Sequence, residues 1–525
     1  MARILARCAP GLLLVSPALA ADFADCLPED AMVYVETDSP RAITERLAGL
    51  DLLDRERRSA EDLRERLGAQ LARWTGSNWA RWFLSLRTVR RVRFAFLEGG
   101  GGRRDRYLLS FDLAEAAPLV ALSAKRFGDG LETVVHRGRT CLVFSDSRSQ
   151  PVQGAFLDDQ FVVGVGPGAL ADVVDALLDG LPRSLGRNEA FRRVAREHGG
   201  RPLWGWVRLD LGDAGLGERF DGVARLGDLT AIGFGDDVSG DRARVSLYHA
   251  PGQPIVRLIQ TNPPGADLLR WLPADSRYAL ATEIPDVAGR WRSILDVLVR
   301  GEEAGFGTGV VRERVDAMEA ALGLEVDDAL RASDGRCALL LSARTPAETM
   351  VPNLAVVLGV ADRERVAALV ERSIERGGLF RDVDPAAIRL ESYRGFSVGT
   401  VEGRFGWALD ERYLLFCGNA DDVRPLIDRH AGAGATRGVD DAGMVHVLSP
   451  CVLLESMEAC EAARAVAPGR PIRIAMRQRE DRLELDLDVP LAGLIALALE
   501  EPERFFDPRA WRTRLVDLLR WMGLS

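Results

Sequence analysis

Runs of alternating apolar and polar residues recur along the chain and predict half-buried β-strands. The segments AMVYVE, VRFAFLE and RYLLSFDL come first, and TVVHRGRTCLVFS then predicts two strands that turn at Arg137 and Gly138. Between them lie stretches with the period of an amphipathic helix, such as ALADVVDALLDG. Paired strands that alternate with single helices predict an α+β fold. Its mostly antiparallel sheet would carry helices on one face, in an extended form of the split β-α-β pattern.

The same order of predicted elements occurs twice. LPEDAMVYVETDSP, which begins at Leu27, returns as LPADSRYALATEIP, which begins at Leu272. GAFLDDQFVVGVG corresponds to FGWALDERYLLFCG, and a second turn at Arg394 and Gly395 corresponds to the first turn. Shared order, turn residues and spacing predict two tandem homologous units.

The first twenty residues have the pattern of a secretory leader. Arg3 and Arg7 precede the apolar run GLLLV, and small residues lie before the predicted cleavage after Ala20. The mature chain is therefore expected in the periplasm or the extracellular space. No later run reaches the roughly eighteen apolar residues of a membrane span, so no transmembrane segment is expected.

Leader and repeat together give the predicted organisation of the chain. It comprises a signal peptide over 1–20, a first α+β unit over 21–250, a Pro-rich connection over 251–271, a second α+β unit over 272–502, and a C-terminal amphipathic helix over 503–525.

The composition is that of an ordinary globular protein. The chain has 525 residues, 47% of them hydrophobic and 28% charged, which is enough for two or three domains. Its formal net charge is −10 and it contains no basic block, so nucleic acid is not an expected partner.

Six cysteines remain after the leader: Cys26, Cys141, Cys337, Cys417, Cys451 and Cys460. Disulfides are permitted in an oxidising compartment, but so few cysteines in a chain of this length do not make a disulfide scaffold. Cys141, Cys337 and Cys417 lie in apolar strand-like runs and are expected to be buried thiols. Cys451 and Cys460 lie nine residues apart on one predicted helix, which is too far for a disulfide between them. The sequence leaves the other pairings open, and no cysteine spacing resembles a zinc site.

The motifs LPED and LPAD, each leading into an apolar strand, occur in an exported chain of this size. In this respect the sequence resembles a family of uncharacterised exported bacterial proteins known only as a domain of unknown function. The resemblance implies export and the fold. It brings no catalytic residues with it.

The segment VVGVGPGALADVV, residues 162–174, has the strand, glycine turn and helix of a dinucleotide-binding loop. The corresponding segment of the second copy, LLFCGNADDVRPL, loses the glycine pattern and places Asp421 and Asp422 at the helix start. Carboxylates there cap a helix but repel a phosphate. The segment is therefore interpreted as a structural turn, and no cofactor is expected.

Other candidate groups are also interpreted as structural. The acid pairs Asp158–Asp159 and Asp410–Glu411 lie in predicted hairpin turns, where adjacent side chains point apart. The histidines fall in no metal or catalytic motif. Trp204 and Trp206 are expected to pack in the core or between domains, and the alternative for this pair is a binding platform. No catalytic, cofactor-binding or metal-binding residue is assigned.

The predicted C-terminal helix has one apolar stripe, formed by Trp511, Leu515, Leu518, Leu519 and Met522. We expect this stripe to dock on the protein's own second unit. The alternative is an interface for a partner or a membrane surface, which nearby arginines would assist.

These patterns favour an exported, non-enzymatic binding or scaffold protein, whose partner is an unknown protein or envelope component. The alternative is a secreted hydrolase with a site at the junction of the two units. The ligand and the oligomeric state are left open by the sequence.

Overall fold

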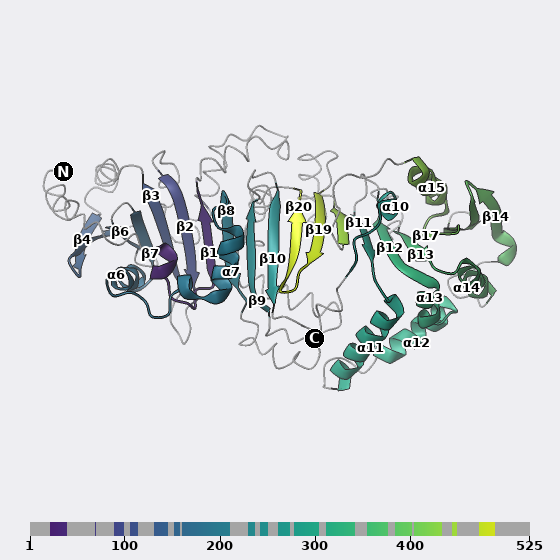
Figure 1. Cartoon of the computed structure of the whole chain (residues 1–525), viewed down its shortest axis with the longest axis horizontal. Coiled ribbons are helices and arrows are strands. Elements are labelled where there is room, and N and C mark those ends of the chain that lie inside the picture. Colours follow the sequence, from purple (N-terminus) through teal and green to yellow (C-terminus); the bar gives the residue numbers. More distant parts are fainter. Residues whose placement is uncertain are drawn as a thin grey trace. The chain divides into compact units, whose positions relative to one another are not determined.

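The computed structural model describes residues 22–38, 69, 89–98, 105–113, 131–144, 152–157, 160–209, 229–236, 242–249, 261–272, 278–303, 311–341, 354–375, 384–401, 404–432, 444–448 and 472–488. These residues form two compact units, the first reaching Tyr248 and the second running from His249 to Asp488 (Figure 1). The predicted leader, the first part of the Pro-rich connection and the predicted C-terminal helix lie outside the described residues.

The first unit is built on a sheet whose described strands are β1 (Val33–Thr37), β2 (Val89–Leu97), β3 (Arg106–Leu113), β4 (Leu131–His136), β5 (Arg139–Phe144), β6 (Val152–Leu157), β7 (Gln160–Val165), β8 (Leu203–Arg208), β9 (Leu229–Asp236) and β10 (Ala243–His249). Their order across the sheet is β4-β5-β6-β7-β3-β2-β1-β8-β9-β10. Neighbours from β4 to β9 are antiparallel. The prediction of an antiparallel sheet is confirmed here.

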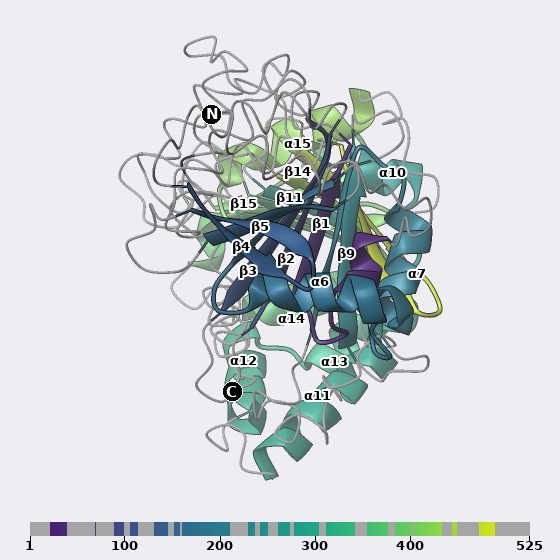
Figure 2. The same ribbon diagram turned by 90° about the vertical axis from the view of Figure 1, so that its left-hand side faces the viewer.

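Helices α6 (Ala169–Asp179) and α7 (Glu189–His198) pack on this sheet with the 3-10 helices η1 (Phe23–Cys26) and η4 (Leu185–Arg187) (Figure 2). α6 buries Leu170, Val173 and Val174, whose helical spacing places them toward the strands. α7 begins after Asn188, whose side chain accepts a hydrogen bond from the Phe191 amide at 3.1 Å. Local capping and amphipathic spacing thus place both helices.

Both faces of the first sheet bury apolar side chains. Leu108 and Val162 pack toward α6, whereas Phe111 and Phe161, each 0% exposed, lie on the opposite face. Alternate residues of a strand point to opposite faces. Near-continuous apolar runs such as QFVVGV therefore supply both faces at once.

Trp204 and Trp206 lie in the core of the first unit, with exposed fractions of 4% and 1%. The Tyr34 ring lies 5.3 Å from Trp204, and the Phe191 ring meets Trp206 edge-on at 5.7 Å. The interpretation of these tryptophans as core residues is confirmed.

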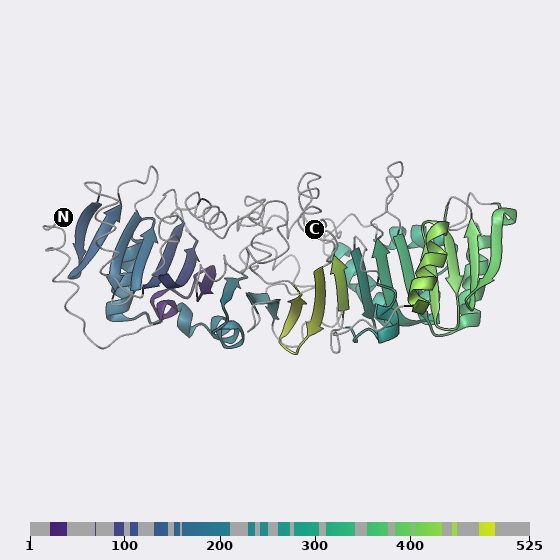
Figure 3. The same ribbon diagram turned by 90° about the horizontal axis from the view of Figure 1, so that it is seen from above.

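The second unit is built on a sheet whose described strands are β11 (Tyr278–Glu283), β12 (Ser333–Leu341), β13 (Leu354–Val360), β14 (Ile388–Tyr393), β15 (Phe396–Val401), β16 (Gly406–Leu409), β17 (Tyr413–Cys417), β18 (Met444–Leu448), β19 (Ile472–Gln478) and β20 (Arg482–Leu487) (Figure 3). Their order is β14-β15-β16-β17-β13-β12-β11-β18-β19-β20, and all neighbours are antiparallel.

The described helices of the second unit are α10 (Ala266–Leu269), α11 (Val287–Glu303), α12 (Val311–Leu322), α13 (Val326–Ala332), α14 (Arg363–Glu375), α15 (Val423–Gly432) and the 3-10 helices η6 (Pro385–Ala387) and η7 (Ala420–Asp422). α15 follows β17 as α6 follows β7, and α10 precedes β11. In the ranges that the structure describes, no helix has both the length and the apolar sequence needed to cross a membrane.

The two Arg–Gly turns have the same backbone conformation. φ is 49° at Arg137 and 81° at Gly138, and it is 49° at Arg394 and 87° at Gly395. Positive φ at both central residues is typical of a type I′ turn, whose twist suits a two-residue hairpin. The turns join β4 to β5 and β14 to β15, as the sequence predicted.

Candidate functional site

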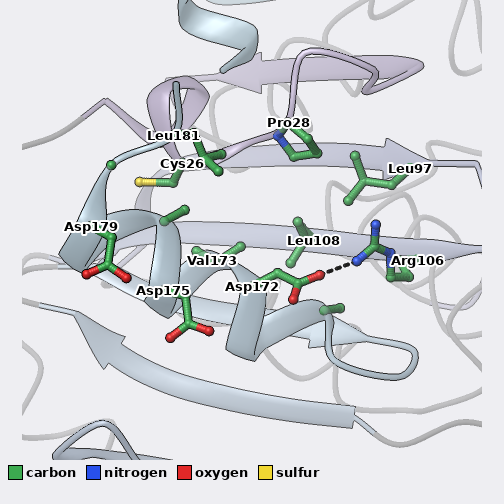
Figure 4. Close-up of a pocket in the computed structure, with 13 residues that line it drawn as sticks. Cys26, Pro28, Leu97, Arg106, Leu108, Asp172, Val173, Asp175, Asp179 and Leu181 are labelled. Carbon is green, nitrogen blue, oxygen red and sulfur yellow. Dashed lines mark hydrogen bonds and ion pairs between the residues drawn. The ribbon is translucent and has the colours of Figure 1, made fainter. Parts of the chain in front are cut away.

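A pocket of about 350 Å³ opens in the first unit between α6, the segment around η1, and strands β2 and β3 (Figure 4). Its apolar lining is formed mainly by Pro28, Leu97, Leu108, Val173 and Leu181. Its charged lining is formed by Arg106, Asp172, Asp175 and Asp179. One arginine against three carboxylates gives the lining residues a formal charge of −2, and Arg137, which pairs with Asp175 and Asp179, reduces the charge of the whole group to −1.

The amphipathic pattern of α6 places the carboxylates at this pocket. Asp172, Asp175 and Asp179 recur at helical spacing and therefore share one side of α6. The adjacent side, with Leu170 and Val174, is buried against the sheet. The acidic row thus lies along the solvent-exposed rim of the pocket while the apolar row fixes the helix.

Each carboxylate of this acidic row has a basic neighbour. Asp172 forms an ion pair with Arg106 across the pocket (Figure 4). Asp175 lies 2.8 Å from the His136 ring, and Asp179 accepts a hydrogen bond from Arg137 at 3.0 Å.

The hydrogen bond from Arg137 and its positive charge hold the pKa of Asp179 below its usual range. This carboxyl group is therefore ionised at neutral pH.

Cys26 lines the pocket but is poorly suited to nucleophilic chemistry. Its side chain is 4% exposed, and burial, with Asp25 and Asp22 nearby, raises the pKa of the thiol to about 11. The thiol is therefore protonated at neutral pH.

Cys141 and Cys417 are also buried free thiols, as expected, whereas Cys337 is half-buried. Cys451 and Cys460 lie outside the described residues.

The first glycine of the VVGVGPGALADVV segment, Gly164 near the end of β7, serves the packing of α6. A Cβ atom on Gly164 would lie 2.6 Å from the Leu170 amide nitrogen, so glycine lets the helix approach the strand. β7 is antiparallel to both β3 and β6, whereas a dinucleotide loop follows a strand of a parallel sheet. This geometry agrees with the structural interpretation of the loop.

The hairpin between β16 and β17 also agrees with its structural interpretation. The Asp410 carboxylate accepts hydrogen bonds from the backbone amides of Arg412 at 2.8 Å and Tyr413 at 2.6 Å. Glu411 projects into solvent and lies 3.2 Å from Arg363. The matching pair Asp158–Asp159 lies outside the described residues.

In the second unit, aromatic rings fill the space between α10 and α15. Trp271, which directly precedes Leu272, is 0% exposed and stacks on His430 of α15 with ring centroids 4.2 Å apart. Phe396 and Tyr413 meet the Trp271 ring edge-on at 6.2 Å and 5.8 Å. Burial lowers the pKa of His430.

Sequence reasoning missed a polar cluster beside these rings. The Tyr413 hydroxyl donates to Asp267 at 2.6 Å, Arg336 donates to the same oxygen at 3.2 Å, and Arg412 forms an ion pair with it. Although burial opposes ionisation, the bond from Tyr413 and the charge of Arg412 hold the pKa of Asp267 below its usual range. These residues come from three separate segments and form no motif, so no local signal could have revealed the cluster.

The predicted C-terminal stripe lies outside the described residues and stays a prediction.

Among the described residues, no group of three or more histidine, cysteine, aspartate or glutamate side chains has the geometry of a metal site.

Comparison with known proteins gives few matches. No protein-family model and no curated protein matches the chain. The solved structure of crystal form IV of TP0453 is 13% identical, with a TM-score of 0.27, and the match covers 44% of this chain and 81% of that chain. Crystal forms III and I of TP0453 are 14% identical, with the same TM-score, and cover 47% of this chain and 90% and 89% of theirs. These values are too low to indicate a shared fold or function.

Proposed function

We propose that the chain is an exported, non-enzymatic binding protein built from two tandem copies of one α+β unit, in which the first copy holds the ligand. The second copy acts as a structural counterpart whose equivalent space is filled. The observation that carries this proposal is the contrast between the pocket beside α6 and the stacked rings beside α15.

The shared order of strands supports the duplication. Counted from the edge strands β4 and β14, the two orders agree position by position. The hairpin tips also meet the following helices alike. His136 lies 2.8 Å from Asp175 of α6, and the Tyr393 hydroxyl donates to Asp428 of α15 at 2.7 Å.

The repeated Leu–Pro sequence relates the pocket to the stacked rings. Cys26 precedes Leu27 in the first copy as Trp271 precedes Leu272 in the second. Cys26 lines the pocket beside α6, whereas the much larger Trp271 is fully buried against α15. The small side chain of Cys26 thus leaves a space open in the first copy, whereas the indole of Trp271 fills the corresponding space in the second copy.

The lining favours a small ligand with an apolar body and a positively charged group. A volume of about 350 Å³ is typical of the smaller ligand pockets of proteins. Aliphatic side chains would cover the body of the ligand, and the net negative lining would attract an amine and disfavour an acid of the same shape.

Paired ligands test this proposal. Aliphatic and aromatic amines are titrated into the purified chain beside carboxylic acids of matched shape, with thermal shift and calorimetry as readouts. Amines are expected to bind more tightly. The variant Asp175→Asn, combined with Asp179→Asn, is expected to weaken amine binding about fivefold, since each exposed charge contributes modestly.

The matched control is Asp428→Asn on α15, which should leave the affinity unchanged. Equal binding of amines and acids, or an equal effect of the control, contradicts the proposed site. Chemical conversion of a bound ligand contradicts the non-enzymatic function.

A further inference from the structure

Strand β14 lies at the edge of the sheet of the second unit (Figure 1). Among the described residues, β15 is the strand that pairs with it. Leu390, in the middle of β14, is 76% exposed, more than any other large apolar side chain in the described ranges. An exposed edge with an apolar centre is a template for pairing with another strand.

The type I′ turn fixes which backbone groups of β14 point outward. In a two-residue hairpin, the closing pair Tyr393 and Phe396 exchanges hydrogen bonds. Alternation along the ladder then directs Arg389 and Glu391 toward β15 in the same way. The N–H and C=O groups of Ile388, Leu390 and Ser392 consequently face the open edge.

We infer that two copies of this chain associate through β14, paired antiparallel about a two-fold axis at Leu390. In this register Leu390 exchanges both backbone hydrogen bonds with Leu390 of the partner subunit. Ile388 does the same with Ser392 of the partner subunit, and the converse pair is made by symmetry. All three outward-facing residues of each copy are then satisfied.

The charges of β14 are complementary in this register. Arg389 lies opposite Glu391 of the partner subunit, and the pair occurs twice. Both are non-hydrogen-bonded positions, where opposed side chains approach most closely. Centring the pairing on Glu391 instead opposes two carboxylates, and centring it on Arg389 opposes two guanidinium groups. The sequence of the strand thus selects the register at Leu390.

Helix α15 holds β14 ready for this pairing. Arg424 donates to Glu391 at 3.0 Å and 2.5 Å, and Tyr393 donates to Asp428 at 2.7 Å. The Glu391 carboxylate has further acceptor capacity for Arg389 of the partner subunit. Glu391 and Tyr393 face α15, so Leu390 projects from the opposite side of the strand.

The edge strand of the first unit lacks this complementarity. β4 exposes Val134 by 49% and Val135 by 68%. Its sequence, LETVVH, would place Glu132 opposite Val134 in a pairing centred on Thr133. β14, and not β4, therefore carries the self-recognising pattern.

Charge reversal tests the inference on the purified chain without its predicted leader. Sedimentation velocity over a wide range of concentrations is expected to show a reversible dimer. Arg389→Glu opposes four carboxylates in two pairs, and Glu391→Arg opposes four guanidinium groups. Each single variant is expected to dimerise at least about tenfold more weakly. An equimolar mixture of the two is expected to dimerise at least about tenfold more tightly than either variant alone, because it restores both opposite-charge pairs across the interface. The Arg424–Glu391 ion pair within the Glu391→Arg chain stays lost, so the affinity is compared with the single variants.

The matched control is Val135→Lys on β4, which should not change the dimer. A wild-type chain that stays monomeric throughout, single variants that dimerise normally, or a mixture that stays monomeric would each overturn the inference. Loss of association in Val135→Lys would also overturn it and assign the contact to β4. Circular dichroism of each variant confirms that the fold is unchanged.

Discussion

His430 illustrates how burial sets the charge of one side chain. Its ring stacks on Trp271, and burial lowers its pKa because an imidazolium loses hydration there. The unfolded chain therefore binds more protons than the folded chain in the interval between the two pKa values. Stability is fully present above the unfolded pKa and declines as the pH falls through that value.

Acidification below about pH 6.5, the ordinary pKa of histidine, should destabilise the wild-type chain more than the variant His430→Phe. Phenylalanine keeps an aromatic ring on Trp271 but binds no proton. Chemical denaturation followed by tryptophan fluorescence across this pH range measures the difference. Equal pH dependence in both chains contradicts the assignment of a depressed pKa to His430.

At the scale of elements, two glycines have different physical roles. Gly164 lets α6 approach β7, because a Cβ atom there would meet the Leu170 backbone at 2.6 Å. Gly138 has open space around its Cβ position, but its φ of 81° is unfavourable for other residues. One glycine is required by packing and the other by backbone conformation alone.

Gly164→Ala is therefore expected to cost about 2–3 kcal/mol, since the helix must move away from the strand. Gly138→Ala is expected to cost about 1–2 kcal/mol, the strain of a positive φ. Denaturant titration of both variants measures these free energies of unfolding. A smaller loss for Gly164→Ala than for Gly138→Ala contradicts the packing role.

Local sequence patterns predicted the elements that depend on neighbouring residues. The two Arg–Gly hairpins and helix α6 lie where turn residues and apolar spacing placed them. The pocket could not be predicted in this way. Its ion pair joins Arg106 to Asp172, which are 66 residues apart and meet only because β3 pairs with β7.

At the scale of the whole molecule, the proposed duplication allows residues at corresponding positions of the two units to be compared. The glycine loop before α6 has a counterpart before α15 that uses Asn419 instead, whose side chain accepts from the Asp421 amide at 3.1 Å. Both loops start a helix after an antiparallel strand. The two loops occupy corresponding positions but use different residues, which indicates that both serve to start the following helix.

The predicted C-terminal helix belongs to the same scale. If its apolar stripe docks on the second unit, truncation after Asp507 should lower the free energy of unfolding by at least about 3 kcal/mol, since several large side chains lose their burial. Differential scanning calorimetry measures the change. Leu515→Arg should reproduce it in part, and Thr513→Arg, off the stripe, should not. Unchanged stability with lost binding to lipid vesicles contradicts docking and favours an interface.

The hairpins β4–β5 and β14–β15 each consist of two six-residue strands around a two-residue turn. Their equal length makes them interchangeable without altering the spacing of the chain. A chimera carrying the β14–β15 hairpin in both units would present a self-complementary edge in each. In the proposed dimer each chain pairs through one edge, so the assembly closes at two copies. The chimera would bind a further chain at each of its two edges and would grow into linear fibres. The sequence difference between the two hairpins therefore also limits polymerisation.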